Sequence, residues 1–173
     1  MIKSLTICFT LFSSLSVFAV QLCDGESETS PTSRFTINNG DAFVVDSITG
    51  LAWARCVVGQ SWNSDSKTCE GEALRLTWKE ALQQANSLVI DSRTDWRVPN
   101  IKELATIVER KCVSPAKNLV VFPGAPDGRY WSSTPNTSAS AMTESWAVGF
   151  YNGRIDSQDK MSDFYVRMVR YAE

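Results

Sequence analysis

Two short apolar runs near the start of the chain predict a β-hairpin. Residues 42–46 (AFVVD) and 51–55 (LAWAR) are rich in Val, Ala and aromatic side chains, and residues 47–50 between them are small and polar and include a glycine. Short apolar runs bounded by turn residues are typical of strands. We therefore expect 42–46 to pair with 51–55.

Two segments in the middle of the chain have a helical spacing. The first begins at Thr77, which forms a capping box with Glu80, and its apolar side chains recur every three or four residues at Trp78, Ala81, Leu82, Ala85 and Leu88. The second begins at Asn100, with Glu103 in the equivalent position. Its apolar residues continue to Val108, and the basic pair at 110–111, which suits a helix C-terminus, predicts its end.

The second half of the chain predicts strands. Residues 113–128 contain three prolines and two glycines and predict a long ordered loop. Four strands are expected after it, at 130–133, 145–151, 154–158 and 164–171, with Asn152-Gly153 as a two-residue hairpin turn. Strands, then two helices, then strands indicate an α+β protein with an antiparallel sheet.

The N-terminus has the pattern of a secretory signal peptide. Lys3 gives a positive start, residues 5–18 are mostly apolar, and Val17 and Ala19 form a small-residue cleavage pattern. We expect cleavage after Ala19, a polar tether over 20–33, a single domain over 34–173, and a secreted, periplasmic or cell-surface location. The apolar run is shorter than the roughly 20 residues of a membrane span, so we expect no span after cleavage.

The cysteines predict two disulfides. Cleavage removes Cys8 and leaves four cysteines, and an even number in an exported chain is typical of disulfide bonding. Four cysteines allow three pairings. Cys56 and Cys69 bracket a polar loop, which favours a bond between them and leaves Cys23 to pair with Cys112.

Composition excludes several function classes. The chain has 173 residues and no histidine, which excludes Ser-His-Asp and Cys-His catalysis and any zinc site that needs an imidazole. Without residues 1–19 it has 16 basic residues (17 less Lys3) and 19 acidic residues, a net charge of −3, which argues against a nucleic-acid partner. No metal site or cofactor is expected.

Five strings, in this order, carry a resemblance to a known family. They are TGLAWARC (49–56), DWRVPNIKEL (95–104), Phe122-Pro123, YWSS (130–133) and YVRMVR (165–170). Together they resemble the Lcl C-terminal domain family, named after a collagen-like adhesin of Legionella. The resemblance implies a variant of the C-type lectin fold, in which two helices pack on a small twisted antiparallel sheet with long loops. It also suggests binding to glycans by analogy with the adhesin.

Two strings with candidate chemistry are interpreted as structural. In Asp95-Trp96-Arg97, we expect Trp96 in the core and Arg97 paired with a carboxylate beneath the following helix. In Trp131-Ser132-Ser133, serines stand where calcium-binding lectins have an amide and a carboxylate. Hard cations need carboxylate oxygens, so we expect no calcium.

The candidate ligand-binding residues are Arg129, Tyr151, Asn152 and Arg154, combined with the polar loop 134–144. Aromatic and arginine side chains suit sugars and sulfates. The alternative is that Tyr151 and Arg154 only flank a turn.

The sequence favours an exported, non-catalytic binding module for a polar or anionic glycan or a surface protein. Two alternatives remain: a structural subunit of a surface or secretion assembly, and a glycan-acting enzyme with a carboxylate pair. The oligomeric state is not predicted.

Overall fold

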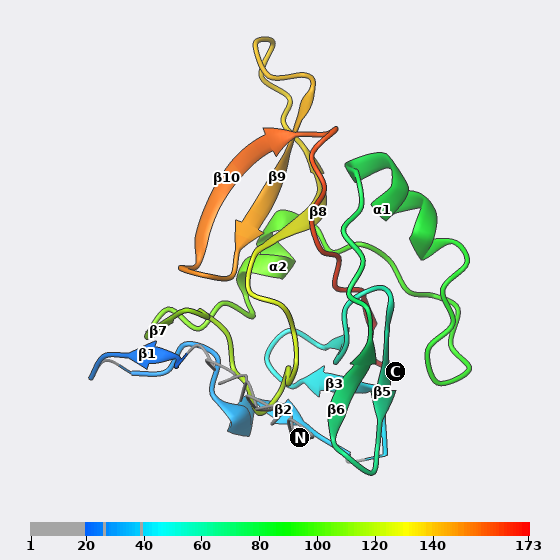
Figure 1. The fold of residues 1–173 in the computed structure, drawn as a ribbon, viewed down its shortest axis with the longest axis vertical. Helices are drawn as coiled ribbons and strands as arrows, with labels where there is room; N and C mark the ends of the chain where they lie inside the picture. Colours follow the sequence, from blue (N-terminus) through cyan, green and yellow to red (C-terminus); the bar gives the residue numbers. More distant parts are fainter. Residues whose placement is uncertain (1–19, 26, 39) are drawn as a thin grey trace, which may run out of the picture.

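Small antiparallel sheets and two helices make up the described part of the chain (Figure 1). The structure is a computed structural model that describes residues 20–25, 27–38 and 40–173. The predicted signal peptide, residues 1–19, lies outside the described residues. Within them the strands form sheets of two, three, four and two strands, which confirms the α+β class. No described helix is long and apolar enough to cross a membrane.

The predicted N-terminal hairpin forms the middle of the four-stranded sheet. The sheet has the order β11-β4-β3-β2 and consists of β2 (Phe35–Thr36), β3 (Phe43–Asp46), β4 (Leu51–Ala54) and β11 (Val169–Tyr171). Every side chain of β4 is buried. Trp53 joins one core cluster and Ala54 joins the other, so this strand has core on both of its faces.

A buried ion pair ties this hairpin to the segment before it. Arg34 is 8% exposed and Asp46 is fully buried. The guanidinium donates two hydrogen bonds to the carboxylate, one of them from Nε to Oδ1 at 2.6 Å. Thr49 and the backbone N–H of Ile48 donate to it as well. Burial by itself would raise the pKa of Asp46, but these hydrogen bonds outweigh it and lower the pKa.

The three-stranded sheet lies between the two helices. It has the order β10-β9-β8 and consists of β8 (Arg129–Pro135), β9 (Glu144–Gly149) and β10 (Arg154–Asp159). Neighbouring residues of a strand point to opposite faces. Tyr130 packs in the same cluster as Leu104 of α2, whereas Trp131 packs in the same cluster as Ala81 of α1. Helices α1 (Trp78–Ala85) and α2 (Ile101–Ala105) therefore cover opposite faces of this sheet.

Both predicted capping boxes are present, but α2 is shorter than expected. The helix ends at Ala105 rather than near residue 110. Beyond it the N–H of Glu109 donates to the carbonyl of Ala116 at 3.0 Å. The Glu109 carboxylate accepts hydrogen bonds from the N–H groups of Thr29 and Ser30. These tertiary hydrogen bonds take the place of the last helical turn.

The turn between β9 and β10 also differs from the prediction. Residues 150–153 form a four-residue turn, in which Gly153 has φ +74°, instead of a two-residue turn at 152–153. The carbonyls of Phe150 and Tyr151 accept hydrogen bonds from the N–H groups of Ala116 and Ser114. Because the long loop takes these carbonyls, residues 150 and 151 cannot continue the ladder with β10.

The C-terminal segment 164–171 links the two larger sheets. Its side chains alternate as predicted, with Phe164, Val166 and Met168 in one core cluster. Only the last three residues form a strand, because the segment changes partners along its length. The carbonyl of Tyr165 accepts from the N–H of Trp131 in β8, and that of Met168 accepts from the N–H of Ala54 in β4.

Both predicted disulfides are confirmed. Cys23 and Cys112 join β1 (Leu22–Cys23) to β7 (Cys112–Val113), and Cys56 and Cys69 join the chain before β5 (Gln60–Asn63) to β6 (Thr68–Gly71). The second bond closes the base of the segment that was predicted as a polar loop, which forms the hairpin of β5 and β6.

Part of the predicted tether is bound to the domain beyond the disulfide at Cys23. Ser30 is fully buried, and its N–H donates to Glu109 at 2.9 Å. At the end of the predicted tether the chain forms a short 3-10 helix, η1 (Thr32–Arg34).

The DWR string has the structural role that was predicted for it. Trp96 is 3% exposed. Arg97 forms a bidentate ion pair with Glu103 of α2, with N–O distances of 2.7 and 2.8 Å. Asp95 pairs with Arg170 at 3.2 Å.

Candidate functional site

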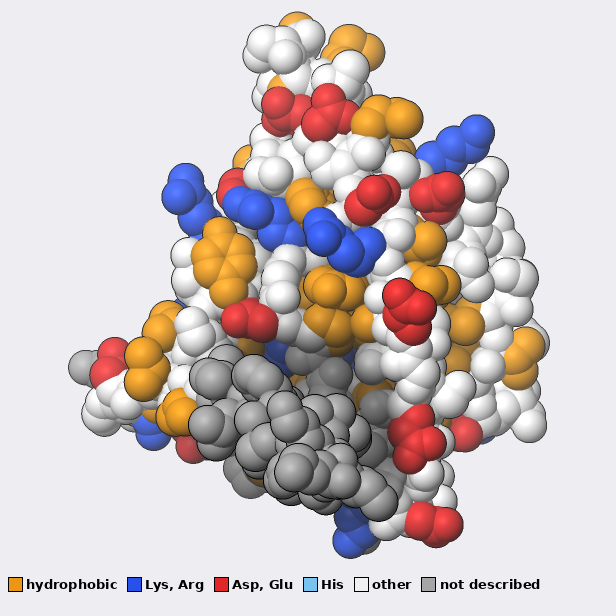
Figure 2. Space-filling model, viewed as in Figure 1, with side chains coloured by type: hydrophobic (Ala, Val, Ile, Leu, Met, Phe, Trp, Pro, Cys, Tyr) orange, Lys and Arg blue, Asp and Glu red, His pale blue; other side chains and the backbone are white. Residues whose placement is uncertain are grey.

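Two of the predicted ligand-binding residues lie in one surface pocket. The pocket has a volume of about 210 Å³ and is lined by Arg75, Asp127, Gly128, Arg129, Tyr151, Phe164 and Tyr165. We call it the Arg129 pocket. Figure 2 shows basic side chains grouped over the three-stranded sheet, with acidic side chains near them. The pocket therefore combines two guanidinium groups with aromatic walls.

Glycines allow the tyrosine rings to lie against the sheet. A Cβ atom at Gly149 would come within 2.7 Å of the ring of Tyr151, and one at Gly128 within 3.0 Å of the ring of Tyr165. Any larger residue at these positions would displace the ring. The Tyr151 ring thus covers the end of β9 in the place of a side chain from residue 149.

Arg129 is held by long contacts. Its Nη2 lies 3.3 Å from Asp156 Oδ2 and 3.5 Å from the hydroxyl of Tyr151, distances at the weak end for hydrogen bonds. The guanidinium carbon lies 5.7 Å from the centre of the Tyr151 ring. The pKa of Arg129 is raised, mainly by its hydrogen bond with Asp156, so the guanidinium remains a cation. Because both of its contacts are long, it has hydrogen-bonding capacity left for a ligand.

Arg75 is a site residue that sequence reasoning missed. It lies between β6 and α1, and its Nε donates to the carbonyl of Asp163 at 3.0 Å. This contact follows from the pairing of Leu76 with Phe164. Arg75 is 54 positions from Arg129, and no motif around it indicates that the two meet.

Arg154 lies outside the pocket but on the same row of the sheet. Gly149 pairs with Arg129 on one side and with Arg154 on the other, so the two arginines are two strands apart, about 10 Å, and face the same way. The Tyr151 ring covers the Gly149 position between them. Asn152 has a local role, because its Oδ1 accepts from the N–H of Arg154 at 3.1 Å.

The polar loop 134–144 does not belong to this site. Its first residues extend β8 to Pro135, and the loop proper joins the far end of β8 to the start of β9 (Figure 1). Arg129 and Gly149 lie at the opposite end of that hairpin, roughly 20 Å away at the usual rise of a strand. The expectation of one surface combining the loop with Arg129 and Tyr151 is therefore wrong.

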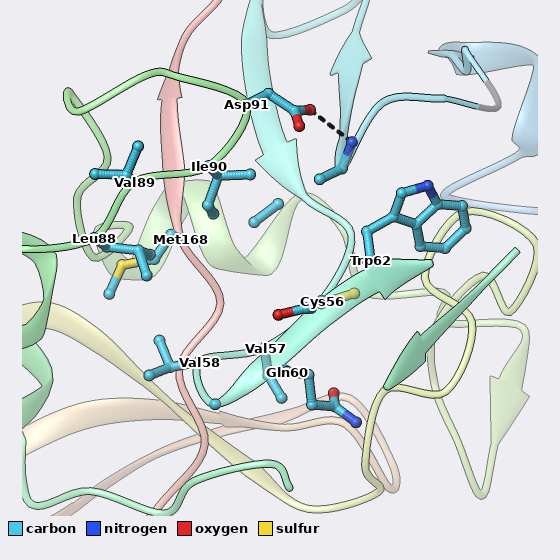
Figure 3. A pocket seen from close by; sticks show the side chains of 14 residues that line it. Cys56, Val57, Val58, Gln60, Trp62, Leu88, Val89, Ile90, Asp91 and Met168 are labelled. Atoms are coloured by element: carbon cyan, nitrogen blue, oxygen red, sulfur yellow. Dashed lines mark hydrogen bonds between the residues drawn. The ribbon is translucent and has the colours of Figure 1, made fainter. Parts of the chain in front are cut away.

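A second pocket lies between β4, β5 and residues 88–91 (Figure 3). Its volume is about 280 Å³. In Figure 3, Leu88, Val58 and Met168 lie toward one side and Trp62 lies toward the other. The Asp91 carboxylate at its rim accepts a hydrogen bond from the N–H of Ala42 at 2.7 Å. Seven of its fourteen lining residues are aliphatic, and none of the fourteen is an arginine or lysine like those of the Arg129 pocket.

In the Trp131-Ser132-Ser133 string, the Ser132 hydroxyl and the Ser133 backbone make hydrogen bonds within the fold. Ser132 Oγ donates to the carbonyl of Trp146 at 2.6 Å, and the N–H of Ser133 donates to the carbonyl of Pro99. No cluster of three or more Cys, Asp or Glu side chains suited to a metal ion occurs among the described residues.

Comparison with known proteins gives one finding. Residues 42–170 match the Lcl C-terminal domain, a range that contains every residue of the Arg129 pocket. A search of curated proteins gave no match.

Proposed function

The chain belongs to the Lcl C-terminal domain family, and on that premise we propose that it is an exported, non-catalytic module that binds a polar or anionic glycan in the Arg129 pocket. The family is associated with a surface adhesin, and the two disulfides fit an extracellular or surface protein. We also propose that the fold is a variant of the C-type lectin fold, since two helices and a long loop surround small antiparallel sheets.

The observation that carries the proposal is the convergence of Arg75 and Arg129 on a pocket with tyrosine walls. Guanidinium groups bind carboxylate and sulfate oxygens in a bidentate manner, and aromatic faces suit the apolar faces of sugar rings. The long contacts of Arg129 to Asp156 and Tyr151 leave it able to change partners without losing a strong bond.

The proposal is tested on the mature protein with a glycan array that includes neutral, uronic-acid and sulfated sugars. We expect retention of acidic glycans that falls as salt increases, because salt screens the attraction between the guanidinium groups of this surface pocket and the anionic groups of the ligand. The double variant R75Q/R129Q should lose retention. The double variant R110Q/K67Q is the matched control, since it removes the same two positive charges from exposed residues outside the pocket.

Both variants should melt close to the wild-type temperature, because the Arg129–Asp156 pair is long and partly exposed, and such pairs contribute only about 0–1 kcal/mol. Retention of acidic glycans by R75Q/R129Q at the wild-type level would show that the ligand binds elsewhere. If no glycan is retained, the assembly-subunit function replaces this one.

A further inference from the structure

Strand β10 is an open edge of the three-stranded sheet. Within the described chain it pairs with β9 only, and Figure 1 shows it as the outermost strand of that sheet. An edge strand presents unpaired N–H and C=O groups to which another strand can bind. Its sequence begins Arg154-Ile155-Asp156, with an apolar residue between two opposite charges.

An apolar hollow lies beside this edge. It has a volume of about 320 Å³ and is lined by Ile101, Lys102, Ala105, Trp146 and Ile155. Ile155 is 36% exposed and shares the α2 face of the sheet with Trp146, because Ser157 pairs with Trp146 and lies two residues along the strand. The hollow therefore reaches the open edge through Ile155.

Two-fold symmetry limits how two copies of this edge can pair. When identical antiparallel strands are related by a two-fold axis, one residue lies opposite its own copy. With Asp156 at the axis, two carboxylates would face each other. With Ser157 at the axis, Ile155 would face Asp159 and Arg154 would face Lys160 of the second copy. Both registers oppose like charges.

The register centred on Ile155 is self-complementary. Ile155 then faces Ile155 of the second copy. Arg154 of each copy faces Asp156 of the other copy, which gives two pairs of opposite charge. The Asp156 carboxylate is held weakly in the monomer, since its Oδ2 has only a long contact to Arg129 and its buried Oδ1 has no hydrogen-bond partner among the described residues. A rotation of this partly exposed side chain would bring an oxygen to Arg154 of the second copy without breaking a strong bond. The two apolar hollows become neighbours across the axis.

We propose that the protein forms a two-fold dimer through β10, centred on Ile155, which joins the two three-stranded sheets into one six-stranded sheet. The axis is perpendicular to the sheet, so both Arg129 pockets face the same side. A ligand with repeated acidic groups then binds two pockets of one dimer, which increases its retention. The dimer does not depend on the proposed function, because its association is measured without any glycan.

Sedimentation velocity of the mature protein, from about 1 µM to about 1 mM, measures the association. We expect a reversible monomer–dimer equilibrium. Ile155→Lys should weaken the dimer affinity at least tenfold, because the lysine ammonium groups of the two copies would face each other at the axis. Ile48→Lys is the matched control, since Ile48 is an exposed isoleucine in the turn between β3 and β4, and it should dimerise as the wild type does.

Cysteine cross-linking tests the register. Opposed residues of antiparallel strands have Cα atoms about 4.5–5.5 Å apart, which suits a disulfide. Under mild oxidation, Ile155→Cys should form a covalent dimer with both native disulfides retained, whereas Ser157→Cys should stay largely monomeric.

Faster cross-linking of Ser157→Cys than of Ile155→Cys would overturn the proposed register. A monomer throughout the concentration range, or a dimer that Ile155→Lys leaves unchanged, would overturn the interface itself. Loss of glycan retention with the dimer intact would instead count against the Arg129 pocket alone.

Discussion

Lys117 should make the protein more stable at pH 9 than at pH 7. Its side chain is 2% exposed, and Nζ donates to the carbonyls of Ala125 and Pro126 at 2.5 and 2.8 Å. Burial, reinforced by the neighbouring charge of Arg167, lowers the pKa of Lys117 to about 7. In the unfolded chain its pKa is about 10.4.

The sign and size of the effect follow from proton linkage. Between the two pKa values the unfolded chain binds more protons than the folded one, so the free energy of unfolding increases with pH. The slope approaches about 1.4 kcal/mol per pH unit, and because Lys117 is half-titrated at pH 7, the gain from pH 7 to pH 9 is about 2 kcal/mol. The chain has no histidine, so few other groups titrate in this range.

Urea unfolding at pH 7, 8 and 9 measures this dependence. Lys117→Met keeps the length of the side chain without the titrating group and should show a nearly flat profile over the same range. A flat profile for the wild-type protein would refute the reasoning, because Lys117 would then keep its proton in the folded state. Equal slopes for both proteins would assign the effect to another group.

Three further changes test the contacts that hold the fold. Asp46→Asn should reduce the free energy of unfolding in urea by about 3–5 kcal/mol, because Arg34 stays buried without its carboxylate; a loss below about 1 kcal/mol would contradict this. Glu109→Gln removes one of the acceptors for the segment 29–30, and hydrogen exchange at those amides should accelerate; unchanged protection would contradict it. Replacing Cys56 and Cys69 by Ser should cost about 3 kcal/mol by the loop-entropy model, and an unchanged melting temperature would contradict this estimate.

Local patterns in the sequence predicted what local interactions determine. Both capping boxes, the hairpin of β3 and β4 and the alternation of residues 164–171 depend on side chains close together in the chain. The predictions failed where a distant segment takes a backbone group. The last turn of α2 is lost because Glu109 bonds to Ala116 and to residues 29–30. The two-residue turn is lost because the long loop binds the carbonyls of 150 and 151.

The Arg129 pocket also depends on contacts between distant segments, but one of its features can be recognised in the sequence. Arg75 and Arg129 meet only because Leu76 pairs with the C-terminal segment, and no spacing in the chain encodes that pairing. Gly149, however, follows the apolar run 146–148 and stands two residues before a tyrosine. A glycine in a strand often marks a place where another group lies close to the backbone, and here that group is the Tyr151 ring. Gly149→Val should therefore displace the ring and disrupt the pocket before it affects either core cluster, which an altered Tyr151 environment in an NMR spectrum with unchanged core resonances would reveal.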